Sequence, residues 1–337
     1  MPAEGTQAAD AEVTVVIPTK DRPSTLSRTV AAVRAQRGVK TAVVVVDDGS
    51  SPALARETRQ VAESCLVLRH DSSLGVAAAR NAGLAAASTP WVAFVDDDDL
   101  WAPDKLRRQL AAAARHRGTQ WVCSGAALFT QAGGLLAYQP PPHSGDVLPD
   151  LLRGNVIPGG GSGVLARTDL LRRIDGMDTA FSTLADWDCW IRLAVQSPLA
   201  TVAQPDVGYL VHPSSMAHDI GLADRELVRL VAKHDSLYQA LGQRFDDKKW
   251  SDYQSTLAYR SGAWLTGVRL SARLVLRHGQ ASAMLQPAIS LLPERARRPV
   301  RRRRLRRTLQ TLPSGALDWL PCAAALADGA DELLRSH

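Results

Sequence analysis

The stretch Trp91-Val-Ala-Phe-Val-Asp-Asp-Asp-Asp-Leu100 joins an apolar run to four consecutive aspartates. The run is typical of a buried parallel strand, and α/β proteins bind ligands at the carboxyl ends of such strands. Four adjacent carboxylates are unfavourable there unless a positive group shares the site. A divalent cation, bound by carboxylate oxygens together with a phosphate group, would meet this need. The alternative is an acidic turn in which Asp99 or Asp104 caps the next helix.

Apolar strands alternate with helical stretches in the first half of the chain. The expected strands are Val13–Ile17, Ala42–Val46, Leu66–Leu68 and Trp91–Val95. The expected helices cover about residues 24–36, 52–62, 75–87 and 103–115. Strands that are apolar on both faces and separated by helices indicate a parallel sheet covered on both sides. The sequence therefore predicts an α/β fold with a mostly parallel, Rossmann-like sheet flanked by helices.

The pattern loosens after residue 115. Short strands are expected at Trp121–Ser124, Gly125–Phe129 and near Val207–Val211, with a helix over about residues 186–196. From about Ala223 onward, apolar residues recur at helical spacing. We therefore expect a domain boundary between residues 213 and 223, followed by a helical C-terminal region.

Polar residues follow each of the four early strands. They are Pro18-Thr19-Lys20-Asp21-Arg22, Asp47-Asp48-Gly49-Ser50, Gly75-Val-Ala-Ala-Ala-Arg80-Asn81-Ala82-Gly83 and the aspartate run. Because the carboxyl ends of parallel strands meet at one edge of a sheet, these segments are expected to line one crevice. Each segment alone is weak evidence, since Asp-Gly-Ser is also an ordinary turn. Their combination, in this order and spacing, predicts a ligand site.

The composition fits a globular protein. The 337 residues are 45% hydrophobic and 22% charged, enough for one large or two modest domains. Residues 1–12 lack the basic start and apolar core of a signal peptide, and no run approaches the ~18 apolar residues that span a bilayer. The four cysteines show neither pairing nor metal spacing. We expect reduced thiols and a cytoplasmic protein.

Basic charge is concentrated near the C-terminus. Residues 294–307 hold nine arginines and one glutamate, a local charge of +8, so the rest of the chain carries −2 of the net +6. One interpretation of the arginine tract, residues 295–307, is a solvated helix face. A second is a surface for anionic lipid or a lipid-linked acceptor, at the inner face of the membrane. Nucleic-acid binding is less favoured, because no aromatic residues are interleaved.

Five segments together resemble family 2 of the inverting glycosyltransferases, which have the nucleotide-diphospho-sugar transferase (GT-A) fold. They are Val15-Val-Ile-Pro-Thr-Lys-Asp-Arg-Pro23, Val45-Val-Asp-Asp-Gly-Ser50, Gly75–Gly83, Val95-Asp-Asp-Asp-Asp-Leu100 and Ala185-Asp-Trp-Asp-Cys-Trp-Ile-Arg-Leu-Ala194. The resemblance covers roughly residues 12–215. It implies a tail at 1–11, a GT-A domain at 12–218 and a helical region at 219–337.

The resemblance implies a donor site with Mg²⁺ or Mn²⁺. The D-x-D element falls on Asp96 and Asp98, with Asp98 as metal ligand and Asp96 near ribose or water, although Asp97 and Asp99 are equally spaced. Asp96 and His212 are candidate further ligands. The expected nucleotide-sugar contacts are Pro18, Thr19, Asp21, Asp47, Asp48, Arg80, Asp96 and Asp97. A carboxylate of Asp47 or Asp48 could accept the imide N–H of uracil or thymine, which favours a UDP- or dTDP-sugar.

An inverting transfer needs a general base beside the acceptor hydroxyl. By the resemblance, the base comes from an acidic pair that here reads Ala185-Asp186, so the first acid is missing. Asp186 is the favoured base and Asp188 the rival; alternatively, Asp186 only caps the helix. The expected acceptor side holds Gly160, Gly161 and Trp187, against the alternatives of a surface loop and a core tryptophan.

The predicted activity is transfer of a hexose-type sugar to a hydroxyl of a saccharide, lipid-linked glycan, peptide or secondary metabolite. A nucleotidyltransferase would instead carry a glycine-rich, lysine-containing first loop. The alternative of another class is a sugar-nucleotide-binding adaptor with reduced catalysis, which the missing acid at Ala185 keeps open. A homodimer formed through the helical region is a further expectation.

Overall fold

The computed structural model describes residues 11–130, 134–211, 219–260, 264–280, 283, 312 and 315–320. These residues fall into two compact units. The first unit takes its described residues from Met1–Leu148, Val156–Leu210 and Ser314–His337, and the second from Pro149–Asn155 and Val211–Pro313. The domain boundary after residue 218 stays a prediction.

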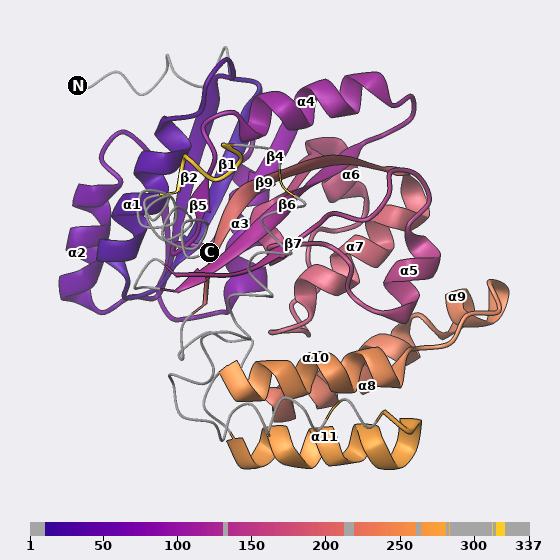
Figure 1. The fold of residues 1–337 in the computed structure, drawn as a ribbon. Coiled ribbons are helices and arrows are strands. Elements are labelled where there is room, and N and C mark those ends of the chain that lie inside the picture. The colour runs from indigo at the N-terminus through magenta and orange to yellow at the C-terminus, as the bar shows by residue number, and fades with distance from the viewer. Residues whose placement is uncertain are drawn as a thin grey trace, which may run out of the picture. The chain divides into compact units, whose positions relative to one another are not determined.

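Within the described residues, one sheet of nine strands forms the centre of the first unit (Figure 1). The strands lie in the order β3-β2-β1-β4-β8-β6-β9-β5, and β7 pairs with β6. Their bounds are β1 Val13–Thr19, β2 Thr41–Asp48, β3 Leu66–His70, β4 Trp91–Phe94, β5 Leu100–Trp101, β6 Trp121–Thr130, β7 Leu135–Gln139, β8 Val164–Arg167 and β9 Leu199–Val211. Strands β1 to β4 pair in parallel, as their two-sided apolar pattern predicts.

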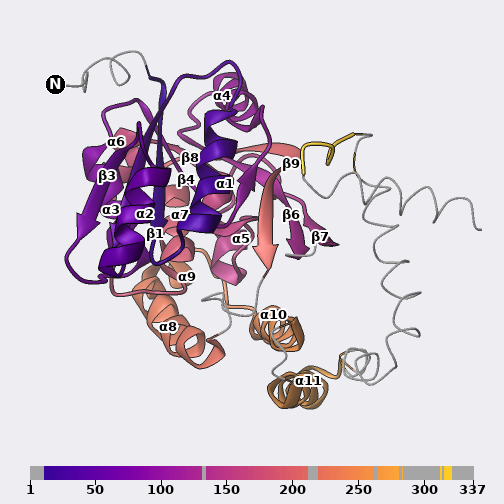
Figure 2. The ribbon, with the colours of Figure 1, turned by 90° about the vertical axis from the view of Figure 1, so that its left-hand side faces the viewer.

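Helices cover both faces of this sheet (Figures 1 and 2). They are α1 Pro23–Arg34, α2 Pro52–Val61, α3 Val76–Ala86, α4 Lys105–Arg115, α6 Thr168–Arg173 and α7 Ala185–Gln196. A short helix, α5 (Leu148–Arg153), and a 3₁₀ turn, η1 (Gly160–Gly163), complete the list up to β9. Pro23 and Pro52 start their helices, where a missing N–H costs nothing. The predicted α/β fold is confirmed.

The second half of the sheet is joined by antiparallel pairs. The prediction of two short strands before and after Ser124 is wrong, because one ten-residue strand, β6, covers both. Gly125 marks a close approach rather than a turn: a Cβ there would lie 2.7 Å from the hydroxyl of Tyr138. Strand β9 begins at Leu199, eight residues before the expected strand, and β5, β7 and β8 were not predicted.

A stacked tryptophan pair attaches α7 to the sheet. The rings of Trp121 on β6 and Trp190 on α7 lie 6.2 Å apart at 17°, and both side chains are fully buried. Such a pair contributes about 0.5–1.5 kcal/mol beyond its buried area. The stack fixes the helix that carries Asp186 in its first turn.

The second unit is helical in its described residues. Besides α5 after its first residue, its helices are α8 Ile220–Lys233, α9 Asp235–Ala240, α10 Asp247–Arg260 and α11 Trp264–His278. Helices α10 and α11 lie side by side (Figure 1). Among the described residues, no helix has the length and apolar character needed to cross a membrane. The arginine tract lies outside the described residues, as does His212.

Candidate active site

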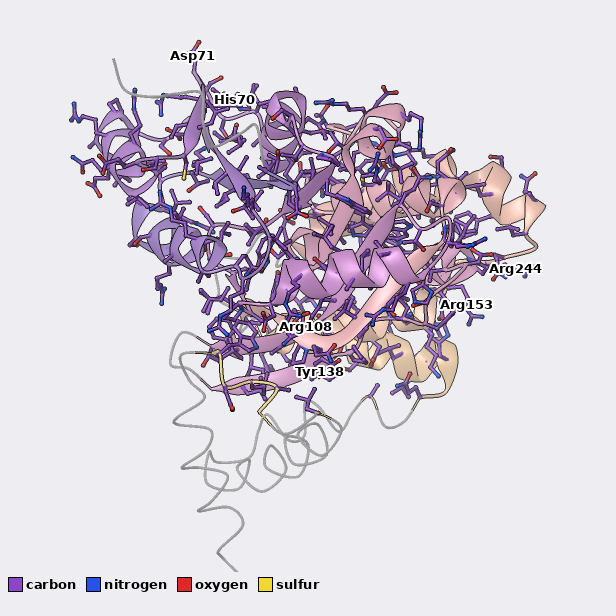
Figure 3. The ribbon with its side chains drawn as sticks, turned by 90° about the horizontal axis from the view of Figure 1, so that it is seen from above. His70, Asp71, Arg108, Tyr138, Arg153 and Arg244 are labelled. Carbon is purple, nitrogen blue, oxygen red and sulfur yellow. The ribbon has the colours of Figure 1, made fainter. Side chains whose placement is uncertain are left out.

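The carboxylate of Asp48 organises the connection between β3 and α3. It accepts hydrogen bonds from the N–H groups of Leu74 (2.8 Å) and Gly75 (2.9 Å) and from the hydroxyl of Ser73 (2.7 Å), and it lies 2.7 Å from Nδ1 of His70. Burial alone would raise the pKa of Asp48, but these hydrogen bonds hold it below the ordinary value. Figure 3 labels His70 at the edge of this unit. Both carboxylate oxygens of Asp48 are therefore already hydrogen-bonded within the loop between β3 and α3.

The neighbouring carboxylate, Asp47, keeps more acceptor capacity. It is 2% exposed; one oxygen accepts the N–H of Ser50 at 2.9 Å, and the other is paired with Arg69. Arg69 also donates to the carbonyl of Ser50 at 2.8 Å. Sequence reasoning missed Arg69. The signal was the parallel register of β2 and β3, which sets Arg69 opposite Asp47 and His70 opposite Asp48.

The four aspartates alternate in exposure. Asp97 and Asp99 are 5% and 0% exposed, whereas Asp96 and Asp98 keep intermediate exposure. Only the latter pair thus presents carboxylates that a ligand could reach without rearrangement. This alternation favours Asp96 and Asp98, rather than Asp97 and Asp99, as the D-x-D pair.

The buried Asp97 joins the ends of β1 and β4. It accepts a 2.6 Å hydrogen bond from the hydroxyl of Thr19, and Arg22 lies 3.3 Å away. Burial raises the pKa of Asp97 to about 7, against the effect of the Thr19 hydroxyl. Arg22 also pairs with Asp98 at 2.9 Å. Arg22 was not predicted as a site residue, although it follows the end of β1 and pairs with two of the four aspartates.

Asp21 and Pro18 complete the β1 end. Asp21 is exposed; its carboxylate accepts the N–H of Ser51 at 2.8 Å, and its own N–H donates to the hydroxyl of Ser50 at 2.8 Å. Pro18 is buried within β1. The ends of β1 and β2 are therefore fastened to each other.

Arg80 on α3 is a buried cation between acidic groups. It is 5% exposed, and its Nη2 donates to Asp96. Burial of the guanidinium lowers its pKa, but the carboxylates of Asp96 and Asp186 outweigh this and raise it above the ordinary value. Gly161 allows the close approach, since a Cβ there would lie 2.7 Å from Nη2 of Arg80. Arg80 is therefore a buried residue of the site and not a surface arginine.

Asp186 and Asp188 have different environments in α7. Asp186 is half-buried in the first turn, and burial raises its pKa to about 6 although the charge of Arg80 lowers it. The cap residue of the helix is Leu184, so Asp186 is not the N-cap. Asp188 is fully buried and paired with Arg192, at 2.8 Å from Nε and 2.7 Å from Nη2.

The predicted acceptor-side residues separate into two groups. Gly160 and Gly161 lie in η1, and a Cβ on Gly160 would stand 3.5 Å from the Asp186 carboxylate. The segment is a largely buried 3₁₀ turn rather than a surface loop. Trp187 is 1% exposed, so its ring packs in the core and offers no surface to an acceptor, contrary to the prediction.

Comparison with known proteins gives a consistent family. Residues 14–132 match the family model described as Glycosyl transferase family 2. The succinoglycan biosynthesis protein ExoO of Rhizobium meliloti is 36% identical over 103 residues, 30% of each chain. The Escherichia coli protein named UDP-Glc:alpha-D-GlcNAc-diphosphoundecaprenol beta-1,3-glucosyltransferase WfgD is 30% identical over 100 residues, 29% of this chain and 40% of that protein. The matches thus span less than half the length of either relative.

A solved structure shares the fold. The crystal structure of S. aureus TarS 1–349 in complex with UDP aligns with 88% of this chain and 91% of that one, with a TM-score of 0.50 and 17% identity. At this identity, the likeness establishes the GT-A type of fold only.

Proposed function

Since the chain belongs to glycosyl transferase family 2 through residues 14–132, we propose that it is a metal-dependent, inverting glycosyltransferase. It transfers a sugar from a nucleotide-diphospho-sugar to an acceptor hydroxyl, with Asp186 as general base. A UDP- or dTDP-sugar is the proposed donor.

One observation carries this proposal: Arg80 contacts Asp96, and its charge also acts on Asp186. The expected donor carboxylates and the expected base therefore face one buried cation. An inverting transfer needs such nearness, because the acceptor hydroxyl must lose its proton as the sugar leaves the diphosphate.

The aspartate pair suits a metal that is bound jointly with the donor. Among the described residues, no group of three or more His, Cys, Asp or Glu side chains is arranged to hold a metal by itself. Asp96 and Asp98, both partly exposed, are hard oxygen donors of the kind Mg²⁺ and Mn²⁺ prefer. These two residues would hold the ion, with diphosphate oxygens and water as its other ligands. The bound ion would stabilise charge on the departing diphosphate.

Environment favours Asp186 over Asp188 as the base. A carboxylate with a pKa of about 6 is ionised at neutral pH and still accepts a proton readily. Asp188 has no exposed surface and is paired with Arg192, so it cannot meet an acceptor hydroxyl without breaking a buried ion pair.

The same reasoning favours Asp47 over Asp48 as the acceptor of the imide N–H of the base. Asp48 already has four polar partners in its loop, whereas Asp47 has two. A carboxylate offers about four lone-pair sites, so Asp47 has acceptor sites left for a base; because its side chain is 2% exposed, the base reaches them only after the surrounding side chains move. Arg69 beside it would donate to a carbonyl oxygen of the base.

For the acceptor we propose a lipid-linked saccharide. The name of WfgD includes a diphosphoundecaprenol-linked acceptor, and the arginine tract offers nine charges for an anionic membrane surface. Homodimer formation through residues 219–337 stays a prediction.

A thermal-shift panel tests the function. Stabilisation by UDP or dTDP that depends on Mg²⁺ or Mn²⁺, and exceeds that by GDP, CDP and ADP, would support the donor site. Slow metal-dependent hydrolysis of the matching labelled sugar nucleotide would then distinguish an enzyme from a binding adaptor. If no nucleotide stabilises the protein, the proposal is wrong.

A further inference from the structure

The hydroxyl of Ser162, in η1, bridges two ends of the aspartate run. It donates to the Asp99 carboxylate at 2.6 Å and accepts the backbone N–H of Asp96 at 3.0 Å. Ser162 is fully buried, as is Asp99. The other Asp99 oxygen accepts the N–H of Leu210, on β9, at 3.1 Å. One serine hydroxyl thus fixes the backbone from which Asp96 and Asp98 project.

Two further hydrogen bonds hold the backbone carbonyls of η1. The indole N–H of Trp101 donates to the Ser162 carbonyl at 3.0 Å, and the side-chain amide of Gln109 donates to the Gly163 carbonyl at 2.9 Å. The ammonium of Lys105, fully buried, donates to Gln109 at 2.9 Å and lies 4.0 Å above the Trp101 ring. These side chains give the glycine-rich turn a rigid support that its own residues lack.

The first two glycines of η1 lie next to Arg80 and Asp186, the buried cation and the proposed base. Gly161 lies against the Arg80 guanidinium, and Gly160 stands next to Asp186. A turn of four residues therefore contacts the aspartate run, the buried cation and the expected base. Its position decides the distance between the donor carboxylates and Asp186.

We propose that η1 is the element that sets the spacing between the donor site and the general base, with Ser162 as its principal positioning residue and Trp101 as a second one. The inference rests on the proposed function and deepens it. Ser162 does not touch substrate; it acts through the backbone of Asp96 and through the placement of Gly160 and Gly161. Loss of its hydroxyl lets the turn and the aspartate run move apart, and small misplacements of reacting groups cost large factors in rate.

The test compares Ser162→Ala with Thr14→Val. Thr14 on β1 is 1% exposed, and its hydroxyl bonds to that of Thr89 at 2.8 Å, so its loss removes one buried hydrogen bond, where the loss of the Ser162 hydroxyl removes two. Thr14 lies at the other end of the strand from Thr19, about 16 Å away at about 3.3 Å per residue. Both variants are measured well below their melting temperatures. The readouts are the Mn²⁺-dependent Kd for the nucleotide, and kcat and KM for transfer.

We expect Ser162→Ala to lose more melting temperature than Thr14→Val, because the Ser162 hydroxyl makes two buried hydrogen bonds, one of them to a carboxylate. Ser162→Ala should also lose roughly tenfold to a hundredfold in kcat and several-fold in Mn²⁺-dependent nucleotide affinity, whereas Thr14→Val keeps both. Trp101→Phe removes only the indole donor, and should show the same losses at smaller size. Its effect on kcat should not add to that of Ser162→Ala, because both act through one turn.

The outcomes separate the two proposals. If Ser162→Ala matches Thr14→Val in kcat and affinity while wild type is active, the positioning role is wrong and the function stands. If Ser162→Ala does not fold, an unchanged kcat in Trp101→Phe shows instead that the positioning role is wrong. Wild type with neither nucleotide binding nor transfer would overturn the proposed function and, with it, this inference.

Discussion

The substitution Asp186→Asn probes the proposed base most directly. Asparagine keeps the size of the side chain and a carbonyl oxygen for the N–H of Trp187, which the carboxylate accepts at 2.7 Å. It removes the proton acceptor. Transfer should therefore fall by roughly 10²–10⁴, or about 3–5 kcal/mol of barrier, while nucleotide affinity stays near wild type.

The pH profile gives a second measure of the same group. With a pKa of about 6, Asp186 is about nine-tenths ionised at pH 7 and about one-tenth at pH 5. The wild-type transfer rate should thus drop about tenfold between these pH values, because only the ionised form accepts the proton. The residual rate of Asp186→Asn should lack this decline.

The free energy of unfolding should fall with rising pH because of this group, whereas the transfer rate rises. The pKa of Asp186 is raised from 3.8 in the unfolded chain to about 6 in the folded one, so folding costs free energy once the group ionises. This cost is absent below pH 3.8, grows up to pH 6 and is complete above it, at up to about 3 kcal/mol before solvent screening. Asp186→Asn should therefore melt at a higher temperature at pH 7.5 and near wild type at pH 3.5.

Both assays are needed for a clear result. Transfer is measured from pH 5 to 8 with saturating donor and metal, and melting temperature across the same range and at pH 3.5. Near-normal transfer in Asp186→Asn, or an acid limb that persists in the variant, would refute the assignment of the base. A lower melting temperature at pH 7.5 would show that the carboxylate stabilises the fold instead.

Three further substitutions test other parts of the proposal. Asp98→Ala should abolish the Mn²⁺-dependent stabilisation by UDP or dTDP with the fold intact, because the residue is partly exposed at the sheet edge; an unchanged metal dependence in thermal-shift assays would contradict this. Asp188→Asn should keep transfer per folded molecule but lose about 3 kcal/mol in urea unfolding, since it leaves the Arg192 guanidinium without its buried carboxylate partner; a large loss of transfer without loss of stability would reverse the assignment of the base. Charge reversal at Arg301–Arg304 should leave hydrolysis of the donor unchanged and weaken binding to anionic liposomes; equal liposome binding would remove the membrane proposal.

The α/β half of the fold, and the sheet edge at which the polar groups gather, follow from the amino-acid sequence alone. Strands β1, β2 and β4 are short, apolar on both faces and separated by helices, so their pattern predicts parallel pairing, whereas β3 lies at the edge of the sheet and is partly exposed. The polar segments at the ends of those strands identified Asp47, Arg80 and the aspartate run, because Asp47 and the aspartates stand at the ends of β2 and β4 and Arg80 lies in the helix after β3.

Tertiary packing, in contrast, distinguishes carboxylates that the sequence leaves equivalent. Asp96 to Asp99 are identical in sequence, and their exposure depends on Thr19, Arg22 and Ser162, which come from distant segments. Likewise Asp186 and Asp188 differ in environment. The charge of Arg80 acts on Asp186, whereas Asp188 is buried in an ion pair with Arg192.

Arg69 and Ser162 were missed because their partners lie in distant segments of the chain. Arg69 gains its partner from the register of two strands 22 residues apart, and Ser162 gains its partners from 63 and 66 residues away. Local periodicity carries no information on such pairings, since they arise when separate segments pack and bury polar groups that must then be hydrogen-bonded. The sequence places these polar groups at the carboxyl ends of β1 to β4, and packing makes some of them exposed and others buried and paired.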